Sequence, residues 1–150
     1  MVVLDEDGKP CKVCDTLESF QSSMAPSKSK TIFGSDQEPP TGKELGNGTW
    51  TMLHSTAANF PLKPTDENKQ DMRNLLTSIS HLFPCRPCGK DFEAYLKRNS
   101  PNVEGREELS LWLCDAHNAV NKKLGKQQFD CKYWKARWRE GWAEYLKDQK

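Results

Sequence analysis

The feature that most constrains the fold is an apolar stripe with helical spacing in the middle of the chain. Between residues 65 and 84, apolar side chains recur every three or four residues, at Met72, Leu75, Leu76, Ile79, Leu82 and Phe83. Thr65 offers a side-chain oxygen to cap the start of such a helix. Pro84 ends it, because proline has no N–H group to continue the backbone hydrogen bonds. We therefore expect a helix between Thr65 and Pro84.

The same spacing recurs on either side of this segment, and no segment alternates apolar and polar residues like a half-buried strand. Further helices are expected over about 43–60, 86–98, 106–124 and from about 130 onward. The last is predicted to be regular, because Trp134, Trp138 and Trp142 follow one another at i, i+4 and i+8. Gly125 stands where the preceding helix would end. The prediction is an all-α fold, a bundle of four long helices with a shorter fifth.

The first 42 residues differ in composition from the rest and are predicted to form a flexible tail. Residues 15–42 are rich in Ser, Pro, Lys and Gly, which is typical of a linker. A C-x-x-C pair, Cys11 and Cys14, precedes this linker. A flexible segment of about 30 residues spans roughly 30 Å root-mean-square. We expect two parts, a tail with its linker over residues 1–42 and a helical domain over residues 43–150.

Charge and hydropathy argue against several classes of partner. The formal net charge is +1, from 22 basic and 21 acidic residues, and no long run has one sign. This balance disfavours a nucleic-acid or anionic-membrane surface. The first residues, MVVLDEDGKP, lack the apolar core of a secretory signal, and no stretch approaches transmembrane length. We expect neither nucleic-acid binding nor membrane insertion.

Six cysteines carry most of the chemical information in the sequence. Cys85 and Cys88 form a second C-x-x-C pair, directly after Pro84 and at the mouth of the expected helix over 86–98. The unpaired N–H groups and positive dipole of a helix start favour a thiolate there, and Arg86 adds positive charge. This position suits thiol–disulfide exchange. A disulfide interpretation would use all six cysteines, as Cys11–Cys14, Cys85–Cys88 and Cys114–Cys131.

Two other interpretations of the cysteines remain open from spacing alone. Cys85, Cys88, Cys114 and His117 have the ligand types and spacing of a Cys3His zinc site in a helical module without enzymatic activity. The cysteines could also be reduced residues of the core. The zinc interpretation leaves Cys131 without a partner.

Polar and aromatic side chains on two of the expected helices suggest a planar cofactor. Cys114, His117, Asn121 and Leu124 fall on one stripe, opposite the face that buries Leu109, Trp112 and Leu113. Trp50 and His54 lie one turn apart on the first helix. Each residue alone fits an ordinary core or surface position. Together with a redox-type C-x-x-C pair, they favour a flat ligand between helices.

Several longer motifs resemble one known family. ELGNGTWTMLHSTAANFP, HLFPCRPCGKDF, LWLCDAHNAVNKKLGKQQFDC and RWREGW occur in order between about Lys43 and Trp142. They are similar to the Erv/ALR family of FAD-linked sulfhydryl oxidases, in particular to mitochondrial members with an N-terminal C-x-x-C pair. The resemblance implies a helical bundle that holds FAD and, we expect, pairs as a non-covalent homodimer. It implies no metal.

The resemblance also implies roles for individual residues. Cys88 would pass electrons to the flavin, Cys85 would meet the incoming dithiol, and Cys114–Cys131 would be a structural disulfide. Cys11 and Cys14 would form the shuttle pair. FAD contacts would come from Lys43, Gly46, Trp50, His54, His117, Asn118, Val120, Asn121, Lys123, Leu124, Lys126, Phe129 and Trp134.

Finally, the resemblance implies partners and a location. Electrons would leave to oxygen or cytochrome c. The protein substrate would be the import oxidoreductase of the mitochondrial intermembrane space, where the chain would support oxidative folding and protein import.

Overall fold

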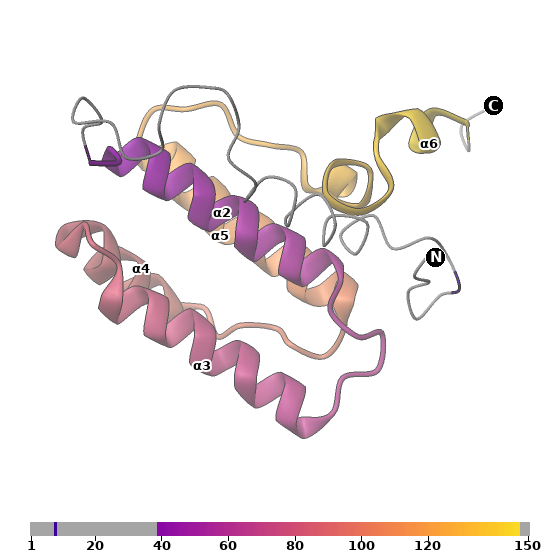
Figure 1. Cartoon of the computed structure of the whole chain (residues 1–150), viewed down its shortest axis with the longest axis horizontal. Coiled ribbons are helices and arrows are strands. Elements are labelled where there is room, and N and C mark those ends of the chain that lie inside the picture. Colours follow the sequence, from indigo (N-terminus) through magenta and orange to yellow (C-terminus); the bar gives the residue numbers. More distant parts are fainter. Residues whose placement is uncertain (1–7, 9–38, 148–150) are drawn as a thin grey trace, which may run out of the picture. The chain divides into compact units, whose positions relative to one another are not determined.

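The computed structural model divides the chain into Met1–Pro40 and Thr41–Lys150, and it describes Gly8 and residues 39–147. The second unit is helical (Figure 1), with no strand among the residues described. Its elements are α2 (Gly42–Ala58), α3 (Asp66–Leu82), α4 (Arg86–Arg98), α5 (Arg106–Lys123), the 3-10 turn η1 (Cys131–Tyr133), the π-helix η2 (Ala136–Glu140) and α6 (Trp142–Lys147). The predicted all-α class is confirmed. Cys11 and Cys14 lie outside the described residues.

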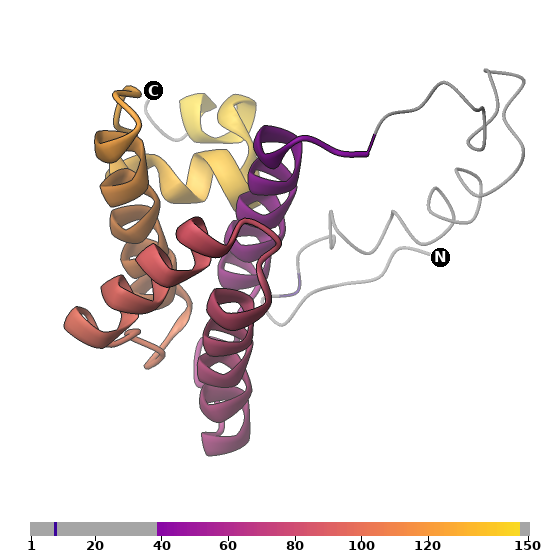
Figure 2. The ribbon, with the colours of Figure 1, turned by 90° about the vertical axis from the view of Figure 1, so that its left-hand side faces the viewer.

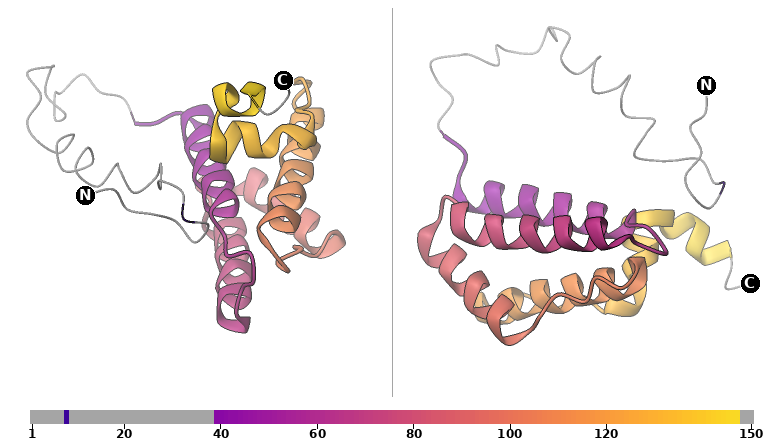
Figure 3. Two further views of the ribbon diagram at one scale, coloured as in Figure 1. Left: turned by 90° about the vertical axis from the view of Figure 1, so that its right-hand side faces the viewer. Right: turned by 90° about the horizontal axis from the view of Figure 1, so that it is seen from below.

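The four long helices pack as two pairs, α2 with α5 and α3 with α4. Figures 2 and 3 show these pairs from three further directions, with η2 and α6 at one end of α2 and α5. The core between the helices is apolar, and its largest fully buried side chains are Leu53, Leu76, Val103, Leu109 and Leu113. Each of these is at most 2% exposed, so the centre of the bundle excludes water.

Local signals in the sequence account for the ends of the helices. Thr41 and Thr65 cap α2 and α3 through capping boxes with Glu44 and Asn68. Pro84 separates α3 from α4 as expected, and α4 has the predicted bounds. Gly125 follows α5 with φ of 66°, a conformation that favours glycine. None of the described helices is long and apolar enough to span a bilayer.

The C-terminal segment is not the regular helix that the tryptophan spacing predicts. The 3-10 turn η1 leads into a short helical turn and then into the π-helix η2, which has more residues per turn than an α-helix. Gly141, with φ of 89°, then ends η2 and redirects the chain. The three tryptophans therefore do not share one face: Trp134 is 7% exposed, whereas Trp142 is 45% exposed.

Candidate functional site

The Cys85–Cys88 disulfide stands at the start of α4. Its S–S distance is 2.08 Å, and Cys85 is the N-cap residue of the helix. Cys85 is partly buried and Cys88 is exposed. The Arg86 guanidinium donates a hydrogen bond of 2.7 Å to the carbonyl of His81, and so ties the start of α4 to the end of α3. A disulfide in this position is accessible to an attacking thiolate.

A close approach between α3 and α4 fixes this disulfide in place. Gly89 follows Cys88 and is the buried residue of α4. A Cβ atom added to it would lie 2.5 Å from the backbone oxygen of Ser80 on α3. Only glycine allows the two backbones to come this close.

A cavity of about 600 Å³ opens beside the disulfide and lies between the two helix pairs. Both Cys85 and Cys88 line it. The other pair supplies aromatic, amide and basic side chains from α2, α5 and the residues just after α5. Those that the sequence singled out are Lys43, Gly46, Trp50, His117, Val120, Asn121, Lys123, Leu124 and Lys126. Asp91 is the one carboxylate in this lining, and it forms an ion pair with Lys123.

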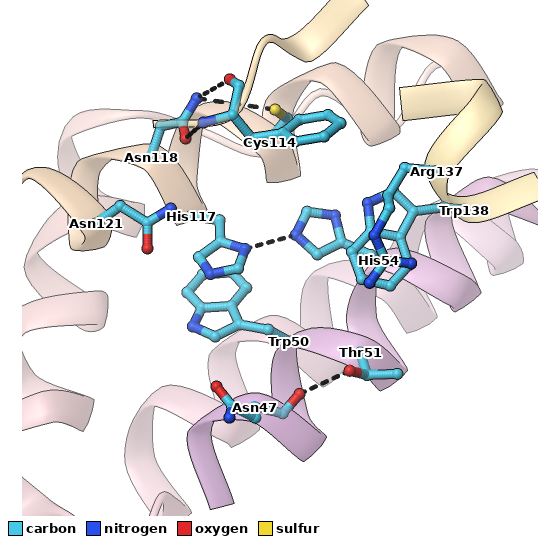
Figure 4. A pocket seen from close by; sticks show the side chains of 11 residues that line it. Asn47, Trp50, Thr51, His54, Cys114, His117, Asn118, Asn121, Arg137 and Trp138 are labelled. Carbon is cyan, nitrogen blue, oxygen red and sulfur yellow. Dashed lines mark hydrogen bonds between the residues drawn. The ribbon is translucent and has the colours of Figure 1, made fainter. Parts of the chain in front are cut away.

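A wall of stacked rings lies where this cavity meets a smaller one: Trp50 and His117 line both cavities, whereas His54 and Trp138 line the smaller one. The Trp50 and His117 rings lie 4.2 Å apart, centroid to centroid, and are nearly parallel at 3°. His54 Nε2 and His117 Nδ1 are 2.9 Å apart and share a hydrogen bond (Figure 4). His54 in turn stacks on Trp138 at 4.6 Å and 7°, with the Arg137 guanidinium over the outer face of Trp138 at 3.9 Å.

Both histidines in this wall are neutral at physiological pH. Burial, aided by the charges of His117 and Arg137, lowers the pKa of His54 from 6.5 to about 3. Burial also lowers the pKa of His117 from 6.5 to about 4, and Lys126 adds to the effect. Each neutral ring carries one N–H donor and one acceptor nitrogen, so one ring can donate the hydrogen bond and the other can accept it. The wall therefore offers flat, uncharged surfaces for stacking.

The smaller cavity has a volume of about 290 Å³ and is lined by all four rings of this wall. Figure 4 shows its lining, in which His54, Asn118 and Asn121 project from α2 and α5 and Trp138 from η2. Cys114 also lines it, and a disulfide of 2.07 Å joins Cys114 to Cys131. Trp50, His117, Asn121 and Asn47 line both cavities, so the two adjoin.

Most of the candidate residues gather around these two cavities, with two exceptions among the residues described. Trp134 lines neither cavity, because it is buried against other parts of the chain. Its place at the wall is taken by Trp138 and Arg137, which the sequence analysis did not select as site residues. Cys131 lines neither cavity and acts through its bond to Cys114.

The zinc interpretation finds no support. Cys85 and Cys88 are bonded to each other, and Cys114 is bonded to Cys131, so the three thiolates that a Cys3His site needs are absent. The described residues contain no group of three or more potential ligands placed to hold a metal ion.

The arrangement fits a long, flat, anionic ligand with one end beside a disulfide. The larger cavity, of about 600 Å³, falls in the range of small-molecule sites, which is roughly 300–1,000 Å³, and the adjoining cavity of about 290 Å³ lies at its lower edge. Aromatic rings provide stacking surfaces at the junction. Lys43, Lys123 and Lys126 provide positive charge. A ring system in the larger cavity would lie beside Cys85 and Cys88, which line it.

Comparisons with known proteins agree with this geometry. A model of the Erv1/Alr family matches residues 47–139. The chain is 42% identical over 169 residues to the mitochondrial FAD-linked sulfhydryl oxidase ERV1 of Saccharomyces cerevisiae, covering 95% of this chain and 89% of the yeast protein. It is 38% identical over 160 residues to the mitochondrial FAD-linked sulfhydryl oxidase erv1 of Schizosaccharomyces pombe, covering 89% and 88%.

A solved structure shares both the fold and much of the sequence. The crystal structure of the yeast Erv1 core aligns with a TM-score of 0.71 and 47% identity, covering 78% of this chain and 99% of that one. The family model spans more than half of the chain, and the two yeast relatives match most of it. The chain therefore belongs to the Erv1/Alr family.

Proposed function

We propose that this chain is an FAD-dependent thiol oxidase that makes disulfides in protein substrates. The observation that carries the proposal is the Cys85–Cys88 disulfide in the wall of a cavity lined by stacked rings and lysines. Membership of the Erv1/Alr family supports it. The relatives from two yeasts are both named FAD-linked sulfhydryl oxidases.

The residues of the two cavities fit FAD. The larger cavity, beside Cys88, suits the flavin ring, and Trp50, Phe92 and His117 offer it apolar and aromatic contacts. The smaller cavity, between His54, Trp138 and Phe129, suits the adenine end. Lys43, Lys123 and Lys126 would neutralise the diphosphate, because cations near a cavity mouth attract anionic groups. When bound, FAD accepts two electrons at a time and passes them to an external acceptor.

The chain itself performs the thiol chemistry. A substrate thiolate attacks the Cys85 sulfur, a mixed disulfide forms, and Cys88 leaves as a thiolate. The second substrate thiol then displaces Cys85, so the substrate gains a disulfide and the Cys85–Cys88 pair gains two electrons and two protons. The N-cap position of Cys85 supports the thiolate form, because helix N–H groups and the dipole stabilise negative charge there. Cys88 lines the cavity, so its thiolate would be the group that supplies these electrons to a flavin bound there.

The tail over residues 1–42 is proposed to act as the shuttle of the helical domain over 43–150. Cys11 and Cys14 would accept electrons from the substrate and deliver them to Cys85–Cys88, within one subunit or across a non-covalent homodimer. The proposed protein substrate is the import oxidoreductase of the mitochondrial intermembrane space, and the proposed acceptor is cytochrome c or oxygen. The mitochondrial names of the two yeast relatives support this location.

A visible spectrum of the purified protein tests the proposal. The protein should be yellow, bleach on anaerobic addition of dithiothreitol, and recover its colour in air. A colourless protein that does not take up added FAD would refute the proposal. The shuttle is tested separately with Cys11→Ser. This variant should oxidise dithiothreitol at the normal rate and lose turnover with a protein dithiol, whereas equal loss with both substrates would contradict the shuttle role.

A further inference from the structure

Asn118 uses both ends of its side-chain amide on the backbone of one residue. Its Nδ2 donates a hydrogen bond of 2.8 Å to the carbonyl of Phe129, and its Oδ1 accepts one of 2.9 Å from the N–H of Phe129. The side chain comes from the middle of α5, whereas Phe129 belongs to the segment after α5. Figure 4 shows Asn118 at the edge of the smaller cavity, with dashed lines at both ends of its side-chain amide. An amide that makes two such bonds imitates a backbone partner and fixes both position and direction.

The same amide lies against the Cys114–Cys131 disulfide. Asn118 Nδ2 is 3.5 Å from the Cys131 sulfur and 3.9 Å from the Cys114 sulfur. Cys131 follows Phe129 by two residues, so the amide and the disulfide both tie this stretch of chain to α5. The two ties are of different kinds, one a pair of hydrogen bonds and the other a covalent link.

Asn121, one turn later on α5, provides the contrast. It lines both cavities, and its side chain makes no hydrogen bond to any described residue. Its amide is therefore available to a ligand. The amide of Asn118 is already occupied, even though Asn118 also lines the smaller cavity.

We propose that Asn118 is a positioning residue that holds Phe129 as a wall of the smaller cavity, and does not serve the cofactor through its own amide. This inference rests on the proposed function, because the wall matters only if the cofactor's adenine end occupies that cavity. A preformed wall favours tight binding, since the segment after α5 does not have to be ordered when the ligand arrives. The disulfide holds the same segment from its far end.

Two measurements on the purified holoprotein test the inference. The first is hydrogen exchange at the Phe129 amide, followed by NMR, and the second is the rate at which bound flavin is released. In Asn118→Ala, exchange at Phe129 should accelerate, and flavin release should accelerate on the order of tenfold because binding loses its preorganised wall. Asn118→Asp puts a carboxylate oxygen in place of the donor, facing the Phe129 carbonyl, so it should accelerate both processes at least as much as Asn118→Ala.

Asn121→Ala is the matched control. It should accelerate flavin release without changing exchange at Phe129, because its amide has no bond to that segment. Unchanged exchange at Phe129 in both Asn118 variants would overturn the inference, as would faster exchange with unchanged flavin release. If the wild-type protein held no flavin, the proposed function would fail. Exchange at Phe129 would still report whether the two Asn118–Phe129 hydrogen bonds exist.

Discussion

The two disulfides of the helical domain differ in exposure and in the length of chain that each one closes into a loop. Cys85–Cys88 spans a sequence separation of 3 at the start of a helix, with Cys88 exposed. Cys114–Cys131 spans a separation of 17, and Cys114 is only 4% exposed. The first closes almost no loop, whereas the second joins α5 to η1 and encloses the segment that carries Phe129.

This contrast separates a disulfide that can react from one that constrains the chain. Closing a short loop removes little entropy from the unfolded state, so Cys85–Cys88 adds little stability but offers an accessible sulfur beside a cavity. The longer loop gains more from closure, and its buried sulfur is shielded from thiolates. Five predictions test this division, from the largest expected effect to the smallest.

Replacing Cys88 should abolish flavin reduction by thiols and leave the fold intact. Cys88→Ser should bind FAD but reduce it with dithiothreitol more slowly by a factor on the order of 10³ or more, because the thiolate that faces the cavity is lost. Stopped-flow absorbance under anaerobic conditions measures the rate. Cys131→Ser is the control and should still reduce its flavin. Normal turnover in Cys88→Ser would make Cys85–Cys88 a structural bond and abolish the contrast.

Replacing Cys131 should weaken the fold and leave the thiol chemistry in place. Loss of the Cys114–Cys131 closure should cost about 3 kcal/mol of unfolding free energy, the entropic value for a loop of this length. Urea denaturation of the holoprotein at fixed FAD concentration measures it. Cys85→Ser, which opens the short loop, should cost clearly less in the same experiment. Equal losses would show that both disulfides stabilise the fold to the same degree.

Much of this division was predictable from the sequence. The stripe from Met72 to Phe83, the cap at Thr65 and the break at Pro84 use only local rules of helix formation, and the structure follows them. The position of Cys85 at a helix start followed from the same rules. Resemblance to the Erv/ALR family implies the Cys114–Cys131 disulfide and an FAD contact for His117, whereas spacing alone leaves both residues open to a zinc site.

Other parts of the site depend on contacts that no local pattern encodes. A regular helix was expected through Trp134 and Trp138, but the π-helix η2 and Gly141 change the register, and Trp138 reaches the cavity instead. The family resemblance implies that Asn118 contacts FAD, and no sequence pattern indicates what its side-chain amide binds. Its bonds to Phe129 depend on how the chain returns after α5.

A third prediction concerns the close packing of α4 on α3 at Gly89, the residue that follows the reactive disulfide. Gly89→Ala places a Cβ atom 2.5 Å from the Ser80 carbonyl oxygen and should destabilise the protein by about 1–3 kcal/mol, the usual cost of overpacking. Thermal unfolding measures the loss. Gly48→Ala on α2 is the matched control, because its Cβ would meet nothing within 4 Å and alanine favours a helix. Equal stability of the two variants would mean that α4 can shift away from α3 freely.

The histidine wall between the two disulfides should make stability depend on pH. The pKa values of His54 and His117, about 3 and about 4, lie below the ordinary 6.5. The unfolded chain therefore binds more protons than the folded one as pH falls below 6.5, and stability is lost in that direction. Between pH 7 and pH 5 the loss should be about 1–2 kcal/mol for each histidine.

Urea titrations at several pH values measure this effect. A His54→Gln/His117→Gln variant should lose much less stability over the same interval, because glutamine does not titrate. An unchanged pH dependence in the double variant would place the titrating groups elsewhere in the chain.

The smallest expected effect concerns the ion pair between Asp91 and Lys123, which joins α4 to α5 at the cavity beside the reactive disulfide. Both side chains are substantially exposed, at 41% and 55%, so Asp91→Asn should change stability by less than about 1 kcal/mol. Loss of the one carboxylate in the lining should slow flavin release by a few-fold, because Lys123 would then face the diphosphate unneutralised. Glu104→Gln, which breaks the Lys69–Glu104 pair outside both cavities, is the control and should leave flavin release unchanged. Faster release from Asp91→Asn would mean that the carboxylate holds Lys123 in position for the cofactor. The ion pair would then position a lysine of the larger cavity, much as Asn118 and the Cys114–Cys131 disulfide position the segment beside the smaller cavity.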